Sequence, residues 1–190
     1  RLNISDLSYF KSINEVKYPA VAKPIFGRGS REVHVVKNRD ELEGYLGLYG
    51  KKFEDVLVQS RIAGDEYTVS VIVNNLNKLI GIVPKKVLCK RGITRAAVTK
   101  KVRAIEKLCK GIVNRLEPRG PFNVQLMIRD GKTYVFEINP RLSTTSVLTD
   151  AAFGNEVELF LENYGKEEIR ENKKMREGVC LFRYEENIIK

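Results

Sequence analysis

The sequence predicts an α+β fold in which most strands are antiparallel. Short apolar or alternating segments recur along the chain, and turns such as Asn74-Asn75-Leu76-Asn77 join some of them directly, which favours antiparallel neighbours. Amphipathic segments with three-four spacing interrupt these strands. With 190 residues, of which 43% are hydrophobic, the chain is long enough to bury a core.

The expected elements follow from periodicity and from cap residues. Before the segment 39–49, Asn38 is a suitable helix cap with Glu41 three residues on, and the strongest helical stripe lies in 98–116. We expect helices at 4–13, 39–49, 98–116, 145–152 and 155–164, and strands around Lys23 and at 33–36, 56–59, 67–73, 78–87, 122–128, 134–138 and 179–184. A charged linker at 166–177 precedes the last strand.

A carboxylate and a carboxamide stand two residues apart at the end of the strand 134–138. Because side chains alternate faces along a strand, Glu137 and Asn139 point to the same side. Pro140 stops the strand, and Arg141 follows it. Hard oxygen ligands beside an arginine suit Mg²⁺ bound to phosphates. The alternative is a solvated polar face followed by an Asn-Pro turn.

The preceding strand adds Gln125 to this face. The dipeptide Asp130-Gly131 predicts a turn between the two strands. A two-residue loop with regular pairing would place Gln125 opposite Phe136 and set a polar side chain against an apolar one. The pattern therefore favours an odd-length loop or a β-bulge, which puts Gln125 opposite or diagonal to Glu137, roughly 5 to 8 Å away.

A glycine-containing loop lies between two short strands near the start of the chain. The first strand carries Lys23, and Gly27-Arg28-Gly29-Ser30 leads towards the second. Glycines let backbone N–H groups approach phosphate oxygens closely. The loop is neither a dinucleotide fingerprint nor a Walker loop, because a strand follows it and no Gly-Lys-Ser/Thr opens a helix. It is interpreted as a flap over phosphates or as an ordinary glycine hairpin.

A fourth segment joins the strand 56–59 to the strand 67–73. The first strand ends in polar residues at Gln59, and the chain turns at Gly64. Such a break exposes backbone groups that the edge of an adenine can use, and Glu66 can accept hydrogen bonds from ribose hydroxyls. Most Gly-Asp-Glu turns are only turns, so this segment indicates a nucleotide only together with the other three.

In this order the four segments resemble the ATP-grasp superfamily, and within it the ATP-binding part of the carbamoyl-phosphate synthetase large subunit and similar carboxylate–amine ligases. The resemblance covers about 18–164 and rests on Phe-Glu-Ile-Asn-Pro-Arg at 136–141 with Lys-Pro-x-x-Gly-x-Gly-Ser at 23–30. It implies two α+β subdomains, with mostly antiparallel sheets, that grip ATP between them. Many members carry an acid where this chain has Gln125, whereas the carbamoyl-phosphate synthetase type has glutamine, which favours that branch.

The resemblance also implies roles for single residues. It assigns ATP phosphates to Lys23, the flap to Gly27, Gly29 and Ser30, the adenine hinge to Gln59, the ribose to Glu66, the metal to Gln125, Glu137 and Asn139, and the transferred phosphate to Arg141.

The implied activity is ATP-dependent ligation with Mg²⁺, or Mn²⁺ in its place. The γ-phosphoryl group passes to a carboxylate, and an amine or ammonia attacks the acyl phosphate; both substrates stay unidentified. Members of the superfamily carry an N-terminal α/β domain for which there is no room before Gly27. We therefore expect part of a longer or split enzyme, with an upstream α/β domain or subunit as partner and little turnover alone. The alternative is a non-catalytic module that binds nucleotide or a partner.

The expected organisation has four parts. They are a lead-in at 1–17, a small subdomain with the glycine flap at 18–60, a second subdomain with the metal site at 61–165, and the charged linker with the final strand at 166–190.

The formal net charge of +10 raises the question of nucleic acid. The positive residues are spread, and no aromatic residues interleave with the cluster nearest the expected phosphates, so base stacking is not favoured. This cluster is expected to hold ATP phosphates or an anionic substrate, or else to be a solvated loop. It consists of Lys85, Lys86, Lys90, Arg91 and Arg95.

Other function classes lack their signatures. The three cysteines form neither a disulfide framework nor a zinc pattern, and Cys109 falls on a helical apolar stripe, which predicts core packing. His34 alternates with valines and is expected at the surface. A protein kinase would carry His-Arg-Asp and Asp-Phe-Gly motifs, and the chain has neither. No apolar run suits a membrane span and no signal peptide opens the chain, which favours the cytoplasm.

Overall fold

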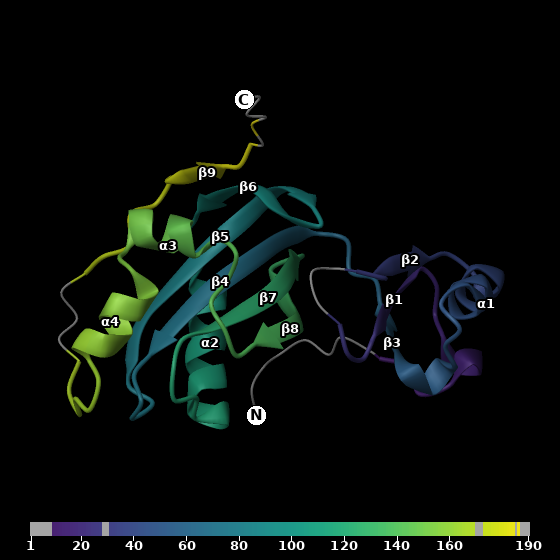
Figure 1. The fold of residues 1–190 in the computed structure, drawn as a ribbon, viewed down its shortest axis with the longest axis horizontal. Helices are drawn as coiled ribbons and strands as arrows, with labels where there is room; N and C mark the ends of the chain where they lie inside the picture. The colour runs from purple at the N-terminus through teal and green to yellow at the C-terminus, as the bar shows by residue number, and fades with distance from the viewer. Residues whose placement is uncertain (1–8, 28–30, 170–172, 185, 187–190) are drawn as a thin grey trace, which may run out of the picture. The chain divides into compact units, whose positions relative to one another are not determined.

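The computed structural model describes residues 9–27, 31–169, 173–184 and 186. The chain divides between Ala63 and Gly64 into two compact units, which we call the N-terminal and the C-terminal unit (Figure 1). The predicted α+β class with mostly antiparallel sheets is confirmed. None of the helices in the part of the chain that the structure describes is long and apolar enough to cross a membrane.

The N-terminal unit is a three-stranded antiparallel sheet packed against one helix. Strands β1 (Ala20–Pro24), β2 (His34–Val36) and β3 (Val56–Ser60) pair in the order β2-β1-β3. Helix α1 (Arg39–Leu48) begins at Asn38, whose side chain accepts the N–H of Glu41, as the sequence predicts. Two 3₁₀ turns lie at Ile13–Glu15 and Phe53–Asp55. The core between sheet and helix consists of Ala20, Ala22, Val36, Leu42, Tyr45, Val56 and Val58.

The helix expected at 4–13 is wrong in its described part. Tyr9 instead makes an isolated antiparallel bridge with Gln59, and the Phe10 N–H donates to the Val58 carbonyl. Extended pairing with β3 satisfies this backbone, while Phe10 and Ile13 pack against the apolar core of the N-terminal unit. The predicted residues 4–8 lie outside the described part of the chain.

The C-terminal unit is built on one antiparallel sheet of six strands in the order β8-β7-β4-β5-β6-β9 (Figure 1). Helix α2 (Arg103–Leu116) packs on one face of this sheet. The short helices α3 (Ser146–Ala152) and α4 (Glu156–Glu162) hydrogen-bond to the other face. The strands are β4 (Asp65–Val73), β5 (Leu79–Arg91), β6 (Ile93–Thr99), β7 (Phe122–Arg129), β8 (Lys132–Asn139) and β9 (Cys180–Phe182).

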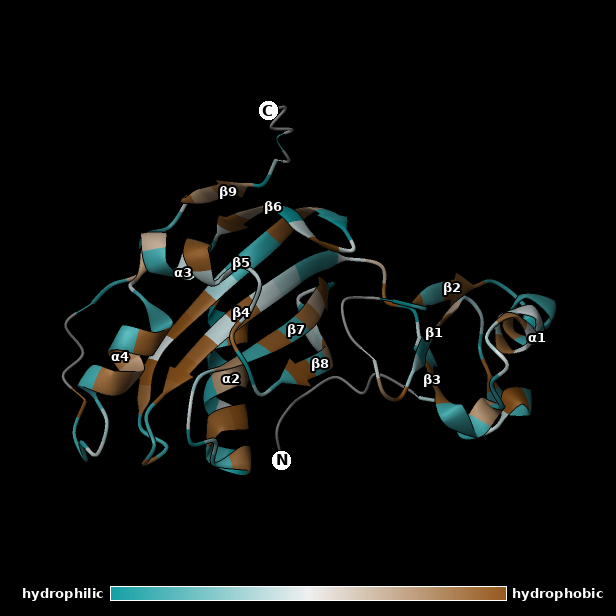
Figure 2. Ribbon diagram, viewed as in Figure 1, coloured by the Kyte–Doolittle hydropathy of each residue, from teal (hydrophilic) through white to brown (hydrophobic). Residues whose placement is uncertain are grey.

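The main core lies between the sheet and α2. Odd-numbered residues of β4 and even-numbered residues of β7 face this helix, and Figure 2 shows the end of β4 and bands along α2 as hydrophobic. Cys109 is fully buried here, which confirms its predicted packing role. The opposite residues of β4 and β7 are therefore free to build a polar face.

Strand β6 is the largest departure from the predicted elements. The expected helix at 98–116 begins only at Arg103, because Val98 and Thr99 belong to β6 and pair with β5. Strand β5 also runs on to Arg91, and Gly92, with a φ of 69°, forms the turn. Val98 and Val102 are spaced like helical residues, so the apolar stripe overran the helix start. The region between the strand expected at 78–87 and the helix expected at 98–116 is consequently part of a hairpin.

Candidate ATP and metal site

The β7–β8 hairpin combines a two-residue loop with a β-bulge. Arg129 pairs with Lys132 across Asp130-Gly131, whose φ values of 51° and 72° fit a tight hairpin turn. The register then shifts by one residue next to Gln125, so that Gln125 pairs with Glu137. Of the two predicted alternatives, an odd-length loop and a bulge, the structure has the bulge, which brings the two polar side chains to one face.

A row of polar residues crosses the sheet at this level. Glu137 pairs with Gln125, Gln125 with Thr68, Thr68 with Lys85, and Lys85 with Thr99. Directly paired residues of antiparallel strands share a face, so all five lie on the face that α3 and α4 cover. We call these five residues the polar row. Glu137 and Gln125 are partly exposed at one end, and the rest of the row is buried.

Asn139 joins Glu137 at the exposed end. Its Nδ2 donates to Glu137 Oε1 over 2.8 Å, which leaves the amide oxygen to face a ligand. Arg141 follows in a turn closed by its own N–H and the Asn139 carbonyl, and its side chain is exposed. In the described residues no three His, Cys, Asp or Glu side chains gather around a possible metal position. One carboxylate with two amide oxygens is a donor set that fits Mg²⁺ when phosphates and water supply the other ligands.

Lys23 and Gln59 belong to the N-terminal unit. Lys23 lies on β1, pairs with Leu57 of β3 and is partly buried. Gln59 pairs with Val21, and its side chain is 6% exposed, so a nucleotide would meet the backbone beyond it more readily than its amide. Gly27 is exposed at the end of the described part of the loop. The predicted flap residues Gly29 and Ser30 lie outside the described residues.

Glu66 lies on β4 in the C-terminal unit, two residues before Thr68 and on the same face. Its Oε1 accepts a hydrogen bond from Lys90 Nζ over 2.6 Å, and this ammonium group lies 5.9 Å from the ring centroid of Phe136. The carboxylate predicted for the ribose is therefore already paired with a cation from the β5–β6 hairpin.

Comparison with known proteins identifies the family of this chain. A family model described as an ATP-grasp domain matches residues 6–145, which include all the predicted site residues. The chain belongs to the ATP-grasp family. Family membership confirms the resemblance inferred from the four segments and their order.

This chain spans about half the length of the ATP-grasp relatives that it matches, and these relatives are enzymes. A D-alanine–D-alanine ligase from Petrotoga mobilis is 29% identical over 153 residues, which cover 72% of this chain and 51% of the ligase. An L-amino acid ligase from Bacillus licheniformis matches with a TM-score of 0.64 and 24% identity over 85% of this chain and 43% of its own. A D-alanine–D-alanine ligase from Bacillus anthracis complexed with ATP matches with a TM-score of 0.60 and 19% identity, over 84% of this chain and 58% of its own. These structural matches show the shared ATP-grasp fold.

The residues of the basic cluster predicted in this ATP-grasp chain do not form one solvent-facing cluster of free charges. Lys85 is fully buried, so it cannot belong to a solvent-facing cluster. Lys86 Nζ pairs with Asp65 over 2.8 Å, and Lys90 pairs with Glu66. These pairs neutralise two of the charges that were expected to attract an anion.

Several buried residues near the ATP-grasp polar row were missed by sequence reasoning. They are Ser70 on β4, Ser143 and Thr145 before α3, Thr149 in α3, and Glu156 at the start of α4. The available signal was the alternation in β4, where Thr68 and Ser70 separate buried valines. It marked a polar face, but only the fold shows that helices cover this face.

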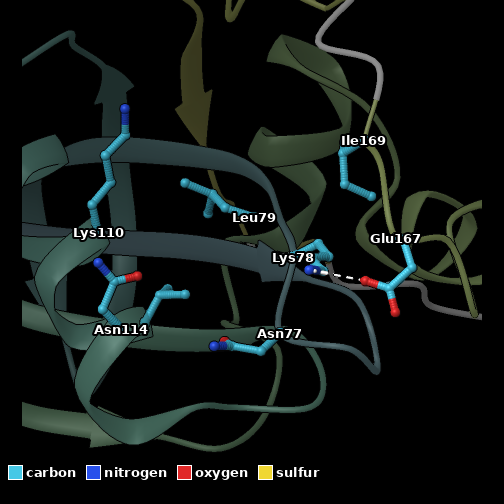
Figure 3. Close-up of a pocket in the computed structure, with 8 residues that line it drawn as sticks. Asn77, Lys78, Leu79, Lys110, Asn114, Glu167 and Ile169 are labelled. Atoms are coloured by element: carbon cyan, nitrogen blue, oxygen red, sulfur yellow. Dashed lines mark ion pairs between the residues drawn. The ribbon is translucent and has the colours of Figure 1, made fainter.

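A separate hollow of about 360 Å³ lies away from these residues. It is lined by Asn77 and Lys78 at the β4–β5 turn, by α2 and by the segment near Glu167. Figure 3 shows Lys78 and Glu167 paired across it, and their charged atoms are 3.0 Å apart. Because none of the predicted site residues lines this hollow, it is not the candidate nucleotide site of the ATP-grasp domain.

Proposed function

We propose that this chain binds ATP with Mg²⁺ and takes part in an ATP-dependent carboxylate–amine ligation. The pairing of Gln125 with Glu137 across the bulge carries the proposal, because it sets two oxygen ligands side by side at an open end of the polar face. The bond from Asn139 to Glu137 adds a third oxygen donor in the same place. ATP-grasp membership and the curated ligase relative support the same chemistry.

The proposed residues divide the task between binding and charge stabilisation. Lys23 binds ATP phosphates, and the residues around Gly27 close over them. Gln125, Glu137 and Asn139 hold the cation, which would withdraw charge from the phosphates when bound. Arg141 steadies the transferred phosphoryl group. Glu66 accepts hydrogen bonds from the ribose hydroxyls while it stays paired with Lys90. The proposed mechanism needs no nucleophile from the protein, so positioning and electrostatics supply the rate gain.

The proposed reaction has two balanced steps. A substrate carboxylate oxygen attacks the γ-phosphorus, and the bond to the β–γ bridging oxygen breaks to release ADP. The amine nitrogen then attacks the acyl carbon, phosphate leaves with the bonding electron pair, and the amine proton passes to solvent. The carbamoyl-phosphate synthetase branch remains part of this proposal, since Gln125 favours it.

Calorimetry with this chain tests the proposal directly. We expect ATP·Mg²⁺ to bind and to raise the melting temperature by mass action. Lys23→Met should lower the affinity for ATP more than the affinity for adenosine, because it removes only a phosphate contact. Lys37→Met, at an exposed position of the same unit, should change neither affinity. A folded sample that shows no heat of binding at millimolar ATP·Mg²⁺ would contradict the proposed function.

A further inference from the structure

Lys85 is the largest fully buried side chain among the described residues. Its Nζ donates to Ser70 Oγ and to Thr149 Oγ1, each over 2.7 Å, and lies 3.5 Å from the Thr145 carbonyl oxygen. An isolated buried ammonium group would be strongly unfavourable, so these partners are needed for Lys85 to stay inside. Because the side chain has no exposure, it cannot contact a nucleotide itself.

The charge of Lys85 is matched through a hydroxyl group. Ser70 Oγ donates to Glu156 Oε1 over 2.7 Å, and Glu156 is 3% exposed. Thr149 Oγ1 lies 3.0 Å from Ser70 Oγ, so both hydroxyl groups lie between the cation and the carboxylate. This arrangement connects β4 and β5 to α3 and α4 by directional bonds. Apolar packing alone would hold the helices less specifically.

A second set of bonds fixes the chain just before α3. Ser143 Oγ lies 3.3 Å from Thr68 Oγ1 and 2.8 Å from Thr145 Oγ1, and it accepts the Thr145 N–H. Thr68 is also held by the side-chain amide of Asn123. The segment 140–145, which carries Arg141, is therefore tied to the middle of the sheet at Ser143 and at Thr145.

We propose that Lys85 is a positioning residue for Arg141. By fixing the first turn of α3 through Thr149 and Thr145, with Ser143 fixing the preceding turn, it holds the segment 140–145 at the end of β8, next to Glu137 and Asn139. The proposal rests on the proposed function, since the role of Arg141 in binding the transferred phosphate belongs to that function. Lys85 acts through other residues and does not touch the substrate.

The variants Thr149→Val and Ser143→Ala test the proposal with small changes of shape. Each removes a hydroxyl group that joins the segment to the sheet. Thr149→Ser keeps the hydroxyl group and should behave as the parent does. Thr99→Val is the matched control, because Thr99 is equally buried in the polar row but donates to the carbonyl of Arg176, which contacts α3 at Ala151 and Ala152, beyond the segment 140–149.

The first measurement is hydrogen exchange of the ligand-free chain. Thr149→Val and Ser143→Ala should speed amide exchange in 140–149 about five- to tenfold, the usual effect of one lost buried hydrogen bond. Thr149→Ser and Thr99→Val should leave these amides unchanged. Unchanged exchange in Thr149→Val, or equal loosening in Thr99→Val, would overturn the positioning role.

The second measurement is the affinity for ATP with and without Mg²⁺. Thr149→Val and Ser143→Ala should lower the affinity for ATP·Mg²⁺ about fivefold or more and leave the affinity for metal-free ATP unchanged, because only the segment that carries Arg141 has moved. Parent-like ATP·Mg²⁺ affinity in both variants would refute the proposal while the proposed function stands. A parent chain that does not bind ATP·Mg²⁺ at all would overturn both.

Discussion

Glu137 brings the only carboxylate to the proposed metal ligands, since Gln125 and Asn139 supply neutral oxygens. Its side chain lies at the partly exposed end of the polar row and bonds to Asn139. Most of the electrostatic attraction for a cation must then come from this one residue and from the phosphates themselves. The effect of single substitutions should differ accordingly among the three ligands.

Glu137→Ala should remove the Mg²⁺-dependent part of ATP affinity, a loss of tenfold or more by the rough strength of charge-assisted contacts. Asn139→Ala should cost less, because a neutral amide contributes no net charge. The fold should survive, since Glu137 is partly exposed and packs little apolar surface. Calorimetry with ATP, with and without Mg²⁺, measures the difference.

The control for this series is Glu158→Ala, which removes the same charge from an exposed position on α4. It should bind ATP·Mg²⁺ as the parent does. Parent-like Mg²⁺ dependence in Glu137→Ala would show that the metal lies elsewhere.

Lys85 should make the stability of the chain depend on pH in alkaline solution. Burial lowers its pKa from 10.5 to about 8, and Glu156 opposes this shift. Between pH 8 and 10.5 the unfolded chain therefore binds the extra proton, so the free energy of unfolding attributable to Lys85 rises with pH, by about 3 kcal/mol in total. Urea denaturation at pH 7.5 and 10 should show this rise in the difference between the parent and Lys85→Met.

The difference between the two chains isolates Lys85 from other groups. Burial raises the pKa of Cys109 to about 12 and also raises the pKa of Tyr67. Both groups are present in the parent and in Lys85→Met, so their contributions cancel in the difference. If the parent and Lys85→Met change in parallel from pH 7.5 to 10, Lys85 is already neutral or is not buried as described.

At the scale of elements, α3 packs so closely on β5 that only glycine fits at position 81. A Cβ atom on Gly81 would collide with the ring of Phe153 at the end of α3. The contact fixes the far end of the helix whose first turn Lys85 holds. The two contacts together locate α3 along the sheet.

Gly81→Ala should destabilise the C-terminal unit by about 1–3 kcal/mol through overpacking. The matched control is Gly44→Ala in α1, where a Cβ atom meets nothing within 4 Å. This change should stabilise the N-terminal unit by about 0.5–1 kcal/mol. Hydrogen exchange resolved by segment reports both effects, and unchanged protection of β4 and β5 in Gly81→Ala would contradict the packing described.

Sequence patterns predict elements well where polarity alternates clearly. The conflict between Gln125 and Phe136 in a regular hairpin was enough to predict either an odd-length loop or a bulge, and the structure has the bulge. Sequence patterns fail where apolar residues keep helical spacing across the end of a strand and the start of a helix, as Val98 and Val102 do. Short polar residues such as Ser143 and Thr149 carry no periodic signal, so their network required the fold.

At the scale of the whole molecule, each unit has its own apolar core. Leu42 is fully buried in the N-terminal core and Val69 in the C-terminal core. Leu42→Ala should cost about 2–5 kcal/mol and raise amide exchange within 6–63. The same measurement on Val69→Ala should affect the sheet of the C-terminal unit instead. A uniform rise across both units in either variant would mean that they unfold together.

The candidate site is only partly predictable at this scale. The sequence motifs predict that Glu137, Asn139 and Gln125 lie together, because their spacing is local to one hairpin. Glu66 was assigned to a ribose without its partner Lys90, which lies 24 residues further on and meets it only through sheet pairing. Lys85 was placed with surface cations, since no local pattern distinguishes a buried lysine from an exposed one.

The bulge beside Gln125 also divides the hairpin into two regularly paired halves whose registers differ by one residue. On the turn side of the bulge Leu126 pairs with Val135, whereas on the other side Gln125 pairs with Glu137. An insertion or deletion of one residue at the turn would therefore reverse which side chains face the ligand, unless the bulge disappeared in the same step. Deleting Phe136 while keeping the two-residue turn should preserve the pairing of Gln125 with Glu137, because Leu126 already pairs with Val135 and the deletion removes only the extra residue of the bulge. Which side chains face the proposed ligand therefore depends on the turn length and the bulge together.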